Sequence, residues 1–186
     1  TSLRSTAMHD DGVNGDLLAG DGVFTAEVPG QAAGTLVAFQ VVAQDTSSEV
    51  AVARYPRGAP VRECLVRVGE TAVGGAFGCY RIWLTQEAHD RWASREKMSN
   101  EDVDATFVYG ANRVVYGAGA RYSGSAYSAP GYTSPTGSLC GYDVSLPADD
   151  GFLGARHVTL DWPIRDATNQ REQLMFWFLD QYDLPN

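Results

Sequence analysis

Short apolar runs separated by turn residues dominate the first third of the chain and constrain its fold more than any other feature. The runs are rich in β-branched and aromatic residues, which favour strands over helices. Glycine, proline, serine and aspartate interrupt them at the spacing expected of a small β-sandwich. The predicted strands are 23–28, 35–43 and 64–68, with turns at 29–30, 33–34, 45–48 and 56–58.

This pattern predicts an α+β protein that begins with an immunoglobulin-like antiparallel β-sandwich over residues 1–70. Small residues and glycines fill 71–79, which suits a linker. Residues 80–186 then mix strand and helix patterns and form the second predicted domain. The chain is 44% hydrophobic and 20% charged, so each part can bury a core.

A dense acidic motif lies near the start of the first domain. Oxygen-rich side chains separated by glycines can converge on Ca²⁺, because glycine permits the sharp turns that bring carboxylates together. The spacing does not match an EF-hand. The alternative is a pair of Asx-turns, in which the same side chains bond only to the local backbone. The predicted Ca²⁺ ligands are Asp11, Asn14, Asp16 and Asp21.

Charge and hydropathy exclude two classes of partner. Lysine plus arginine number 14 against 23 acidic residues, a formal charge of -9, so most of the surface repels a phosphate backbone. Nucleic acid is therefore not an expected partner. No apolar run approaches the ~20 residues that a membrane-spanning helix needs.

The three cysteines do not have zinc-site spacing, and no histidine accompanies them at ligand spacing. Two alternatives remain open. One is a disulfide between Cys64 and Cys79 that leaves Cys140 as a thiol. The other is three buried thiols.

The second half predicts a strand, a helix, a hairpin, two strands and a final helix. Thr85 is the expected cap of the first helix, and Thr168 or Asn169 that of the last. The last helix is apolar around nearly its whole circumference and is expected to be buried on several sides. Residues 123–135 are expected to form a surface loop or lid. The strands are 80–84, 104–109, 113–125, 142–147 and 157–162, and the helices are 86–97 and about 169–182.

Glycines at Gly117, Gly119 and Gly124 resemble a phosphate-binding loop only superficially. A Walker loop ends in Gly-Lys-Ser/Thr, and a dinucleotide-binding loop is followed directly by a helix. Strand-like residues follow here. The pattern therefore favours glycines at a bend in a strand.

The order of these elements, together with several short motifs, resembles the first half of the CotH (spore-coat) kinase family. The sandwich with its Gly-Asp-Gly-Val-Phe-Thr segment is similar to modules that precede such domains. On this resemblance, residues 80–186 are the amino-terminal part of a CotH-like domain. The motifs that carry it are the Tyr80-Arg81 strand, Arg121-x-x-Gly124-Ser125, and Asp166-x-Thr168-x-x-Arg171-Glu172-Gln173 leading to Leu184-Pro185-Asn186.

The resemblance implies a parent protein that is an atypical secreted kinase, transferring phosphate from ATP to serine with Mg²⁺. Arg121 is then expected to contact phosphate, and Arg171 with Glu172 to orient the nucleotide site. Each also has a structural alternative, an ion pair. No catalytic residue is assigned, because the family's catalytic acidic residues lie beyond Asn186, and this segment alone is expected to be inactive. Residues 138–143, where the family typically carries a basic strand, contain no lysine or arginine.

The other hypothesis is a non-catalytic, calcium-stabilised adhesion or assembly module at the cell surface. Under both hypotheses the protein is expected to be extracellular or at the cell surface. Its expected partners are the remainder of its own CotH-like domain beyond Asn186 and surface or coat proteins.

Overall fold

The computed structural model describes residues 3–71, 78–124, 132–136, 140–161, 166–168 and 170–184. By contacts the chain separates into two compact units. The first comprises Thr1–Thr35 with Arg67–Glu70, and the second comprises Leu36–Val66 with Thr71–Asn186. The predicted linker at 71–79 falls largely outside the described residues, which omit 72–77.

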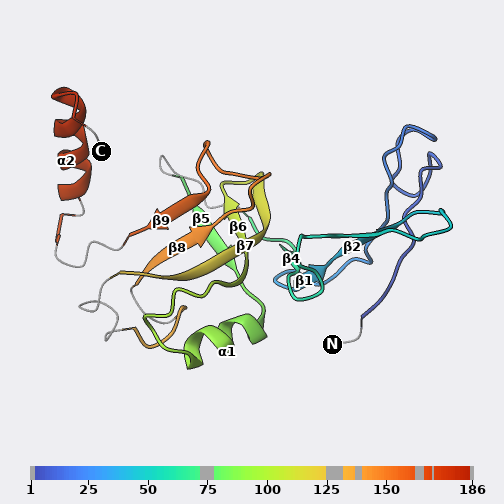
Figure 1. The fold of residues 1–186 in the computed structure, drawn as a ribbon, viewed down its shortest axis with the longest axis horizontal. Helices are drawn as coiled ribbons and strands as arrows, with labels where there is room; N and C mark the ends of the chain where they lie inside the picture. The colour runs from blue at the N-terminus through green and yellow to red at the C-terminus, as the bar shows by residue number, and fades with distance from the viewer. Residues whose placement is uncertain are drawn as a thin grey trace. The chain divides into compact units, whose positions relative to one another are not determined.

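A five-stranded antiparallel sheet with the order β5-β6-β7-β8-β9 forms the centre of the second unit (Figure 1). The predicted hairpin is confirmed, with Tyr109 paired to Arg113 across its turn. The strands are β5 (Tyr80–Trp83), β6 (Val103–Tyr109), β7 (Arg113–Ser123), β8 (Gly141–Ser145) and β9 (His157–Leu160).

A β-bulge interrupts the pairing of β6 with β7. Ala105 pairs with Ala118, but Phe107 pairs with Val115, so β7 carries one extra residue between these pairs. Gly117 lies in this bulge with a φ of 64°, a left-handed conformation that favours glycine. The interpretation of the glycines as a bend in a strand is confirmed for Gly117.

One face of the sheet is covered by helix α1 (Gln86–Ser94), which lies against it in Figure 1. Thr85 caps α1 as predicted, its hydroxyl accepting a hydrogen bond from the Ala88 amide at 3.1 Å. Trp92 is only 1% exposed and packs against the small side chains of β6 and β7. Burying a side chain of this size stabilises the fold by roughly 2–3 kcal/mol. The helix ends at Ser94, three residues before the predicted end.

The opposite face of β6 receives the segment that carries β4 (Cys64–Arg67). Alternation along β6 directs Asp104 and Thr106 away from the face that contacts Trp92. Asp104 accepts a hydrogen bond from the Glu63 amide at 2.9 Å, and Thr106 accepts one from the Leu65 amide at 3.1 Å. Two side chains of β6 therefore accept hydrogen bonds from the amide just before β4 and from the Leu65 amide within it.

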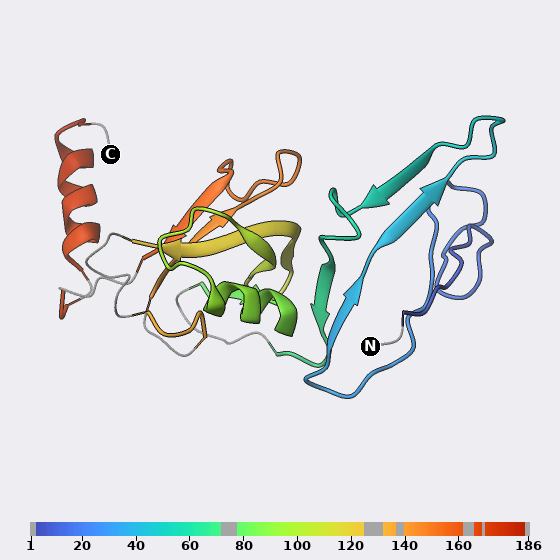
Figure 2. The ribbon, with the colours of Figure 1, turned by 60° about the horizontal axis from the view of Figure 1, so that its bottom comes forward.

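The remaining strands form two small sheets, in which β1 (Leu36–Phe39) pairs with β4 and β2 (Val41–Gln44) pairs with β3 (Val52–Tyr55). Figure 2 shows β1 and β2 in succession, with β3 and β4 returning beside them. The predicted strand 35–43 is thus split at Gln40. The prediction missed β3.

The first unit contains loops rather than the predicted strand at 23–28. Thr25 forms a single bridge with His9, through two backbone hydrogen bonds of 2.8 and 2.9 Å. The strand prediction was wrong here because apolar residues such as Val23 and Phe24 are exposed rather than packed against a partner sheet.

The final helix, α2 (Arg171–Gln181), confirms the predicted element but not its predicted burial. None of its residues is buried, and Phe176 and Trp177 are 50% and 54% exposed. Its apolar circumference therefore finds no packing partner in the described part of the chain.

All three cysteines are free, with Cys64 and Cys140 buried and Cys79 partly exposed. Burial raises the pKa of the Cys64 thiol to about 12 and that of Cys140 as well, which keeps both protonated at neutral pH. Among the described residues no helix is both long and apolar enough to cross a membrane.

Candidate functional site

Three carboxylates converge in the first unit. One oxygen from each of Asp10, Asp16 and Asp21 lies within 4.8 Å of the others. Asp16 is 7% exposed, Asp10 is half-buried and Asp21 is exposed. The group is therefore anchored at one side and open to solvent at the other.

The Asp10 side chain accepts hydrogen bonds from the backbone of a turn ten residues further along the chain. Its Oδ1 accepts hydrogen bonds from the amides of Gly20 and Asp21 at 2.6 and 3.2 Å, and its Oδ2 accepts one from Gly22 at 2.9 Å. Gly20 and Gly22 have φ values of 77° and 86°, which only glycine adopts readily. The turn is thereby folded around Asp10.

Asp16 is held from the other side of the loop. Its Oδ2 accepts a hydrogen bond from the Gly12 amide at 2.6 Å. Gly12 has a φ of 74°, and a side chain there would approach the Ala19 backbone nitrogen at 3.2 Å. The His9–Thr25 bridge closes the base of the loop, so all three carboxylates lie within one closed segment.

The structure brings together two of the four predicted ligands, Asp16 and Asp21, and adds Asp10. Asp11 and Asn14 are not members of the group found among the described residues. Asp11 instead accepts a hydrogen bond from the Val13 amide at 3.1 Å, which is the predicted Asx-turn alternative. Nothing in the sequence distinguishes Asp10 from its neighbour Asp11, because only the fold of the loop brings Asp10 to the turn at Gly20–Gly22.

The donor set fits a hard divalent cation. Three carboxylates this close repel one another unless protons or a cation compensate the charge. No arginine or lysine in the described part of the chain forms an ion pair with them. All three ligand atoms are oxygens, which suits Ca²⁺ rather than metals that prefer thiolate or imidazole.

Arg121 lies on β7 and pairs with two carboxylates. Its guanidinium donates to Asp102 at 2.8 Å and to Asp143 at 3.2 Å, and its side chain is 23% exposed. Asp143 also accepts a hydrogen bond from the Thr159 hydroxyl at 2.8 Å, which extends the ladder to β9. The predicted structural alternative for Arg121, an ion pair, is confirmed.

Arg171 and Glu172 begin α2, and Arg171 also has a carboxylate partner, Asp166 at 3.5 Å. The structure thus gives Arg121 and Arg171 different carboxylate partners. Asp166 accepts hydrogen bonds from the amides of Gln170 and Arg171 at 2.8 and 2.6 Å. The N-cap of α2 is Gln170, whose side chain makes no capping hydrogen bond, so the prediction of Thr168 as the cap is wrong, and the Asp166 carboxylate binds the first amides instead. Asn169 lies outside the described residues.

Hydrogen bonds hold the pKa of Asp166 well below its ordinary value. The Thr168 hydroxyl makes the largest contribution and the Arg171 amide the next. Both bonds favour the charged carboxylate. The start of α2 is therefore organised around one ionised side chain.

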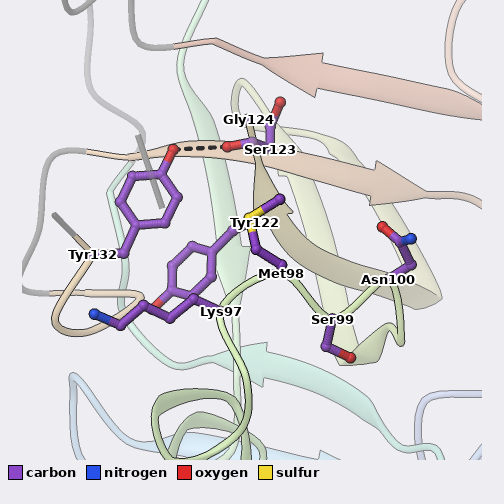
Figure 3. A pocket seen from close by; sticks show the side chains of 8 residues that line it. All are labelled: Lys97, Met98, Ser99, Asn100, Tyr122, Ser123, Gly124 and Tyr132. Carbon is purple, nitrogen blue, oxygen red and sulfur yellow. Dashed lines mark hydrogen bonds between the residues drawn. The ribbon is translucent and has the colours of Figure 1, made fainter. Parts of the chain in front are cut away.

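A small cavity of about 20 Å³ lies beside Gly124, and it holds on the order of one water molecule. In Figure 3 the Lys97 and Asn100 side chains extend to opposite sides of the view rather than toward one another, while the Tyr132 hydroxyl donates to the Ser123 carbonyl oxygen. The lining residues do not form a phosphate cradle, and most of the predicted lid at 123–135 falls in 125–131, outside the described residues.

Comparison with protein families gives one match. Residues 2–54 match the model of the second Ig-like domain of conditioned medium factor. This supports the predicted Ig-like domain at the amino terminus, although the match covers less than a third of the chain. No curated protein and no solved structure matches the chain.

Proposed function

We propose that the amino-terminal unit binds Ca²⁺ through Asp10, Asp16 and Asp21, and that the protein acts outside the cell as a calcium-stabilised binding or assembly module. The observation that carries the proposal is the convergence of three carboxylate oxygens within 4.8 Å. The remaining coordination positions of the ion are left for water and backbone oxygens, as is usual for Ca²⁺.

Binding of Ca²⁺ would add to the hydrogen bonds by which Asp10 already holds the turn at Gly20–Gly22. Asp10 and Asp21 stand at opposite ends of a loop whose base is a single bridge between His9 and Thr25. An ion that binds only the folded loop stabilises it by mass action. Extracellular Ca²⁺ is abundant enough to occupy sites of modest affinity, with Kd values of about 10⁻⁴–10⁻³ M.

The extracellular location is supported by the family match. The name of the matching family refers to conditioned medium, the fluid in which cells have grown. The same proposal includes a location at the cell surface, where the protein would contact surface or coat proteins.

Thermal unfolding with and without chelator tests the metal proposal. We expect Ca²⁺ to raise the Tm of the protein, and EDTA followed by dialysis to reverse the rise. The variant carrying Asp10→Asn, Asp16→Asn and Asp21→Asn should show no response to Ca²⁺. Mg²⁺ at the same concentration serves as the control ion, since it demands stricter octahedral geometry and dehydrates reluctantly. An equal Tm in Ca²⁺ and EDTA would refute the proposal.

A second proposal concerns the longer protein, in which this chain would be the amino-terminal part of a CotH-like kinase that uses ATP and Mg²⁺. The order of strand, helix, hairpin, strand, strand and helix in the second unit supports it, because the resemblance implied that order. The apolar residues of α2 are exposed. We therefore propose that the remainder of the CotH-like domain, beyond Asn186, covers this helix. Arg121, Arg171 and Glu172 are the proposed nucleotide-contacting residues.

Calorimetric titration of the full-length protein with ATP in Mg²⁺ buffer tests this second proposal. Arg121→Ala should weaken ATP binding. Arg113→Ala serves as the matched control, because Arg113 lies on the same strand and pairs with Asp150. Equal weakening by both substitutions would point to lost folding, and absence of ATP binding by the unmodified protein would eliminate the kinase proposal.

A further inference from the structure

A chain of hydrogen bonds runs from Asp90 through His89 on α1 to Ser134, which is the arrangement of acid, base and nucleophile used in nucleophilic catalysis. Asp90 Oδ1 lies 3.0 Å from His89 Nδ1, and His89 Nε2 lies 3.3 Å from Ser134 Oγ. We propose that Ser134, His89 and Asp90 form an acyl-transfer site for small carboxylic esters, with Ser134 as nucleophile, His89 as general base and Asp90 as the residue that positions His89.

The contacts of Asp90 determine the tautomer of His89. Hydrogen bonds from His89 and then from Gln86 lower the pKa of Asp90, so this carboxylate is ionised and can only accept. The proton of neutral His89 therefore resides on Nδ1, facing Asp90. Nε2 is left with a lone pair that faces the hydroxyl group of Ser134, which is the geometry a general base needs.

The base is held on a rigid element. Gln86 Nε2 donates to Asp90 Oδ1 at 2.7 Å from one turn earlier on α1, which fixes the carboxylate. The helix is anchored to the sheet by Trp92 and capped by Thr85. His89 thus retains its direction without contributing to the core, and its side chain is 25% exposed, within reach of a small substrate.

Hydrogen bonds from two tyrosine hydroxyl groups hold the chain on both sides of the nucleophile. Tyr132, two residues before Ser134, is 4% exposed and donates its hydroxyl to the Ser123 carbonyl at 2.7 Å. Pro135, directly after it, accepts a hydrogen bond from the Tyr142 hydroxyl at 2.6 Å. A nucleophile fixed by its neighbours in this way does not have to be ordered in the transition state.

Thr136 also approaches the base at a similar distance, so the choice of Ser134 as nucleophile rests on how its oxygen is held and on steric access. Thr136 Oγ1 lies 3.2 Å from His89 Nε2 and is exposed. The Thr136 amide donates to Ser134 Oγ at 3.2 Å, which helps to fix the position of that oxygen. The primary hydroxyl of serine is also less hindered than the secondary hydroxyl of threonine.

The proposed step balances without a cofactor. Ser134 Oγ attacks the ester carbonyl carbon while its proton moves to His89 Nε2. The bond between the carbonyl carbon and the ester oxygen breaks, and His89 returns the proton to the leaving alkoxide. Water then hydrolyses the acyl-serine by the same proton transfers, which regenerates Ser134 and releases the carboxylic acid.

Covalent labelling with a fluorophosphonate probe tests the proposal in the full chain. Ser134 Oγ should displace fluoride and acquire the phosphonyl group, which peptide mass spectrometry would locate. The release of p-nitrophenol from p-nitrophenyl acetate gives the turnover rate. We expect Ser134→Ala to abolish both signals and His89→Gln to lower both rates by about 10²-fold or more. Asp90→Asn should lower kcat and leave KM nearly unchanged.

Control variants distinguish catalysis from a purely structural role of these hydrogen bonds. Ser94→Ala removes the serine of α1 and should leave both rates unchanged, and Thr136→Val should retain the adduct on Ser134. Each variant's Tm shows whether it is folded. The proposal would be overturned if the unmodified protein formed no adduct on Ser134, or if the adduct formed at the same rate in His89→Gln. The hydrogen bonds would then serve only to join α1 to residues 132–136.

Discussion

The backbone amide of Leu65 donates a hydrogen bond of 3.1 Å to the Thr106 hydroxyl at a place where both residues are fully buried. The two residues are 41 positions apart. The Thr106 side chain thus accepts a β4 amide hydrogen bond that a neighbouring strand would otherwise accept. An amide left without a partner in such a place costs about 1–3 kcal/mol.

Thr106→Val is therefore expected to lower the free energy of unfolding by about 1–3 kcal/mol, since valine fills the space but accepts no hydrogen bond. Thr106→Ser keeps the hydroxyl and removes one methyl group, at a cost of about 1 kcal/mol. Urea unfolding followed by tryptophan fluorescence measures both. Should the valine variant prove as stable as the unmodified protein, the hydrogen bond to Leu65 would not stabilise β4.

Asp104, next to this contact, is predicted to make stability depend on pH. Desolvation raises the pKa of its carboxyl above the ordinary 3.8, despite the hydrogen bond from the Glu63 amide. A raised folded-state pKa means that the folded protein binds the proton more tightly than the unfolded chain does. The contribution to stability is then greatest at low pH and falls as pH rises from the unfolded pKa through the folded one.

The comparison of Asp104→Asn with the unmodified protein isolates this effect. Asparagine keeps an oxygen that can accept from Glu63 and never ionises. We expect the stability of the variant relative to the unmodified protein to increase as pH rises above about 4, and to become constant once Asp104 is fully ionised. A difference that stays constant across this range would show that the carboxyl titrates equally in the folded and unfolded states.

The elements that the sequence predicted correctly are those whose own residues determine them. Thr85 and the apolar spacing of Ala88 and Trp92 specify the start and buried face of α1 locally. Strand-forming residues on each side of the turn at 110–112 likewise specify the hairpin of β6 and β7. These features need no knowledge of distant contacts.

The elements that it missed depend on residues far apart in the chain. Residues 23–28 have strand-forming side chains, yet only Thr25 finds a backbone partner, and strand propensity does not identify that partner. Asp10 reaches the turn at Gly20–Gly22 only because Gly20 and Gly22 adopt left-handed conformations. Motif spacing therefore located the acidic segment correctly but identified only part of the carboxylate group.

This difference predicts distinct effects of two adjacent aspartates. Asp10→Asn removes one charge from the converging carboxylates and should weaken Ca²⁺ binding about tenfold or more, ~1.4 kcal/mol. Asp11→Asn should change Ca²⁺ affinity far less, since Asp11 bonds only to the local Val13 amide. Isothermal titration with Ca²⁺ measures both. A stronger effect of Asp11→Asn would restore the ligand set predicted from the sequence.

The α2 helix is expected to lose its first turn when Asp166 is replaced by alanine. The amides of Gln170 and Arg171 would then lose their shared acceptor. Because hydrogen bonding lowers the folded-state pKa of Asp166, its stabilising effect is present above the unfolded pKa and is lost as pH falls toward the folded one. Hydrogen exchange of the α2 amides measures the loss, and Thr168→Val, which removes only one bond, should have a smaller effect.

Gly119 is predicted to be intolerant of any side chain although its backbone conformation is ordinary. A Cβ placed there would lie 2.6 Å from the Asp102 Cβ and 2.8 Å from its Cγ, so Asp102 would have to move. That movement would separate Asp102 from Arg121, its ion-pair partner at 2.8 Å. We expect Gly119→Ala to lower the free energy of unfolding by about 1–3 kcal/mol.

The matched control for this substitution is Gly30→Ala, because Gly30 also lacks a positive φ and no atom lies within 4 Å of the place that a Cβ would occupy there. At that position alanine should be neutral or stabilise the protein by up to about 1 kcal/mol, since it restricts the unfolded chain. Combining Gly119→Ala with Asp102→Ala tests the mechanism further. If crowding against Asp102 causes the loss, the alanine at 119 should cost less in the absence of the Asp102 carboxyl group than in its presence. Additive losses would instead locate the strain in the β7 backbone.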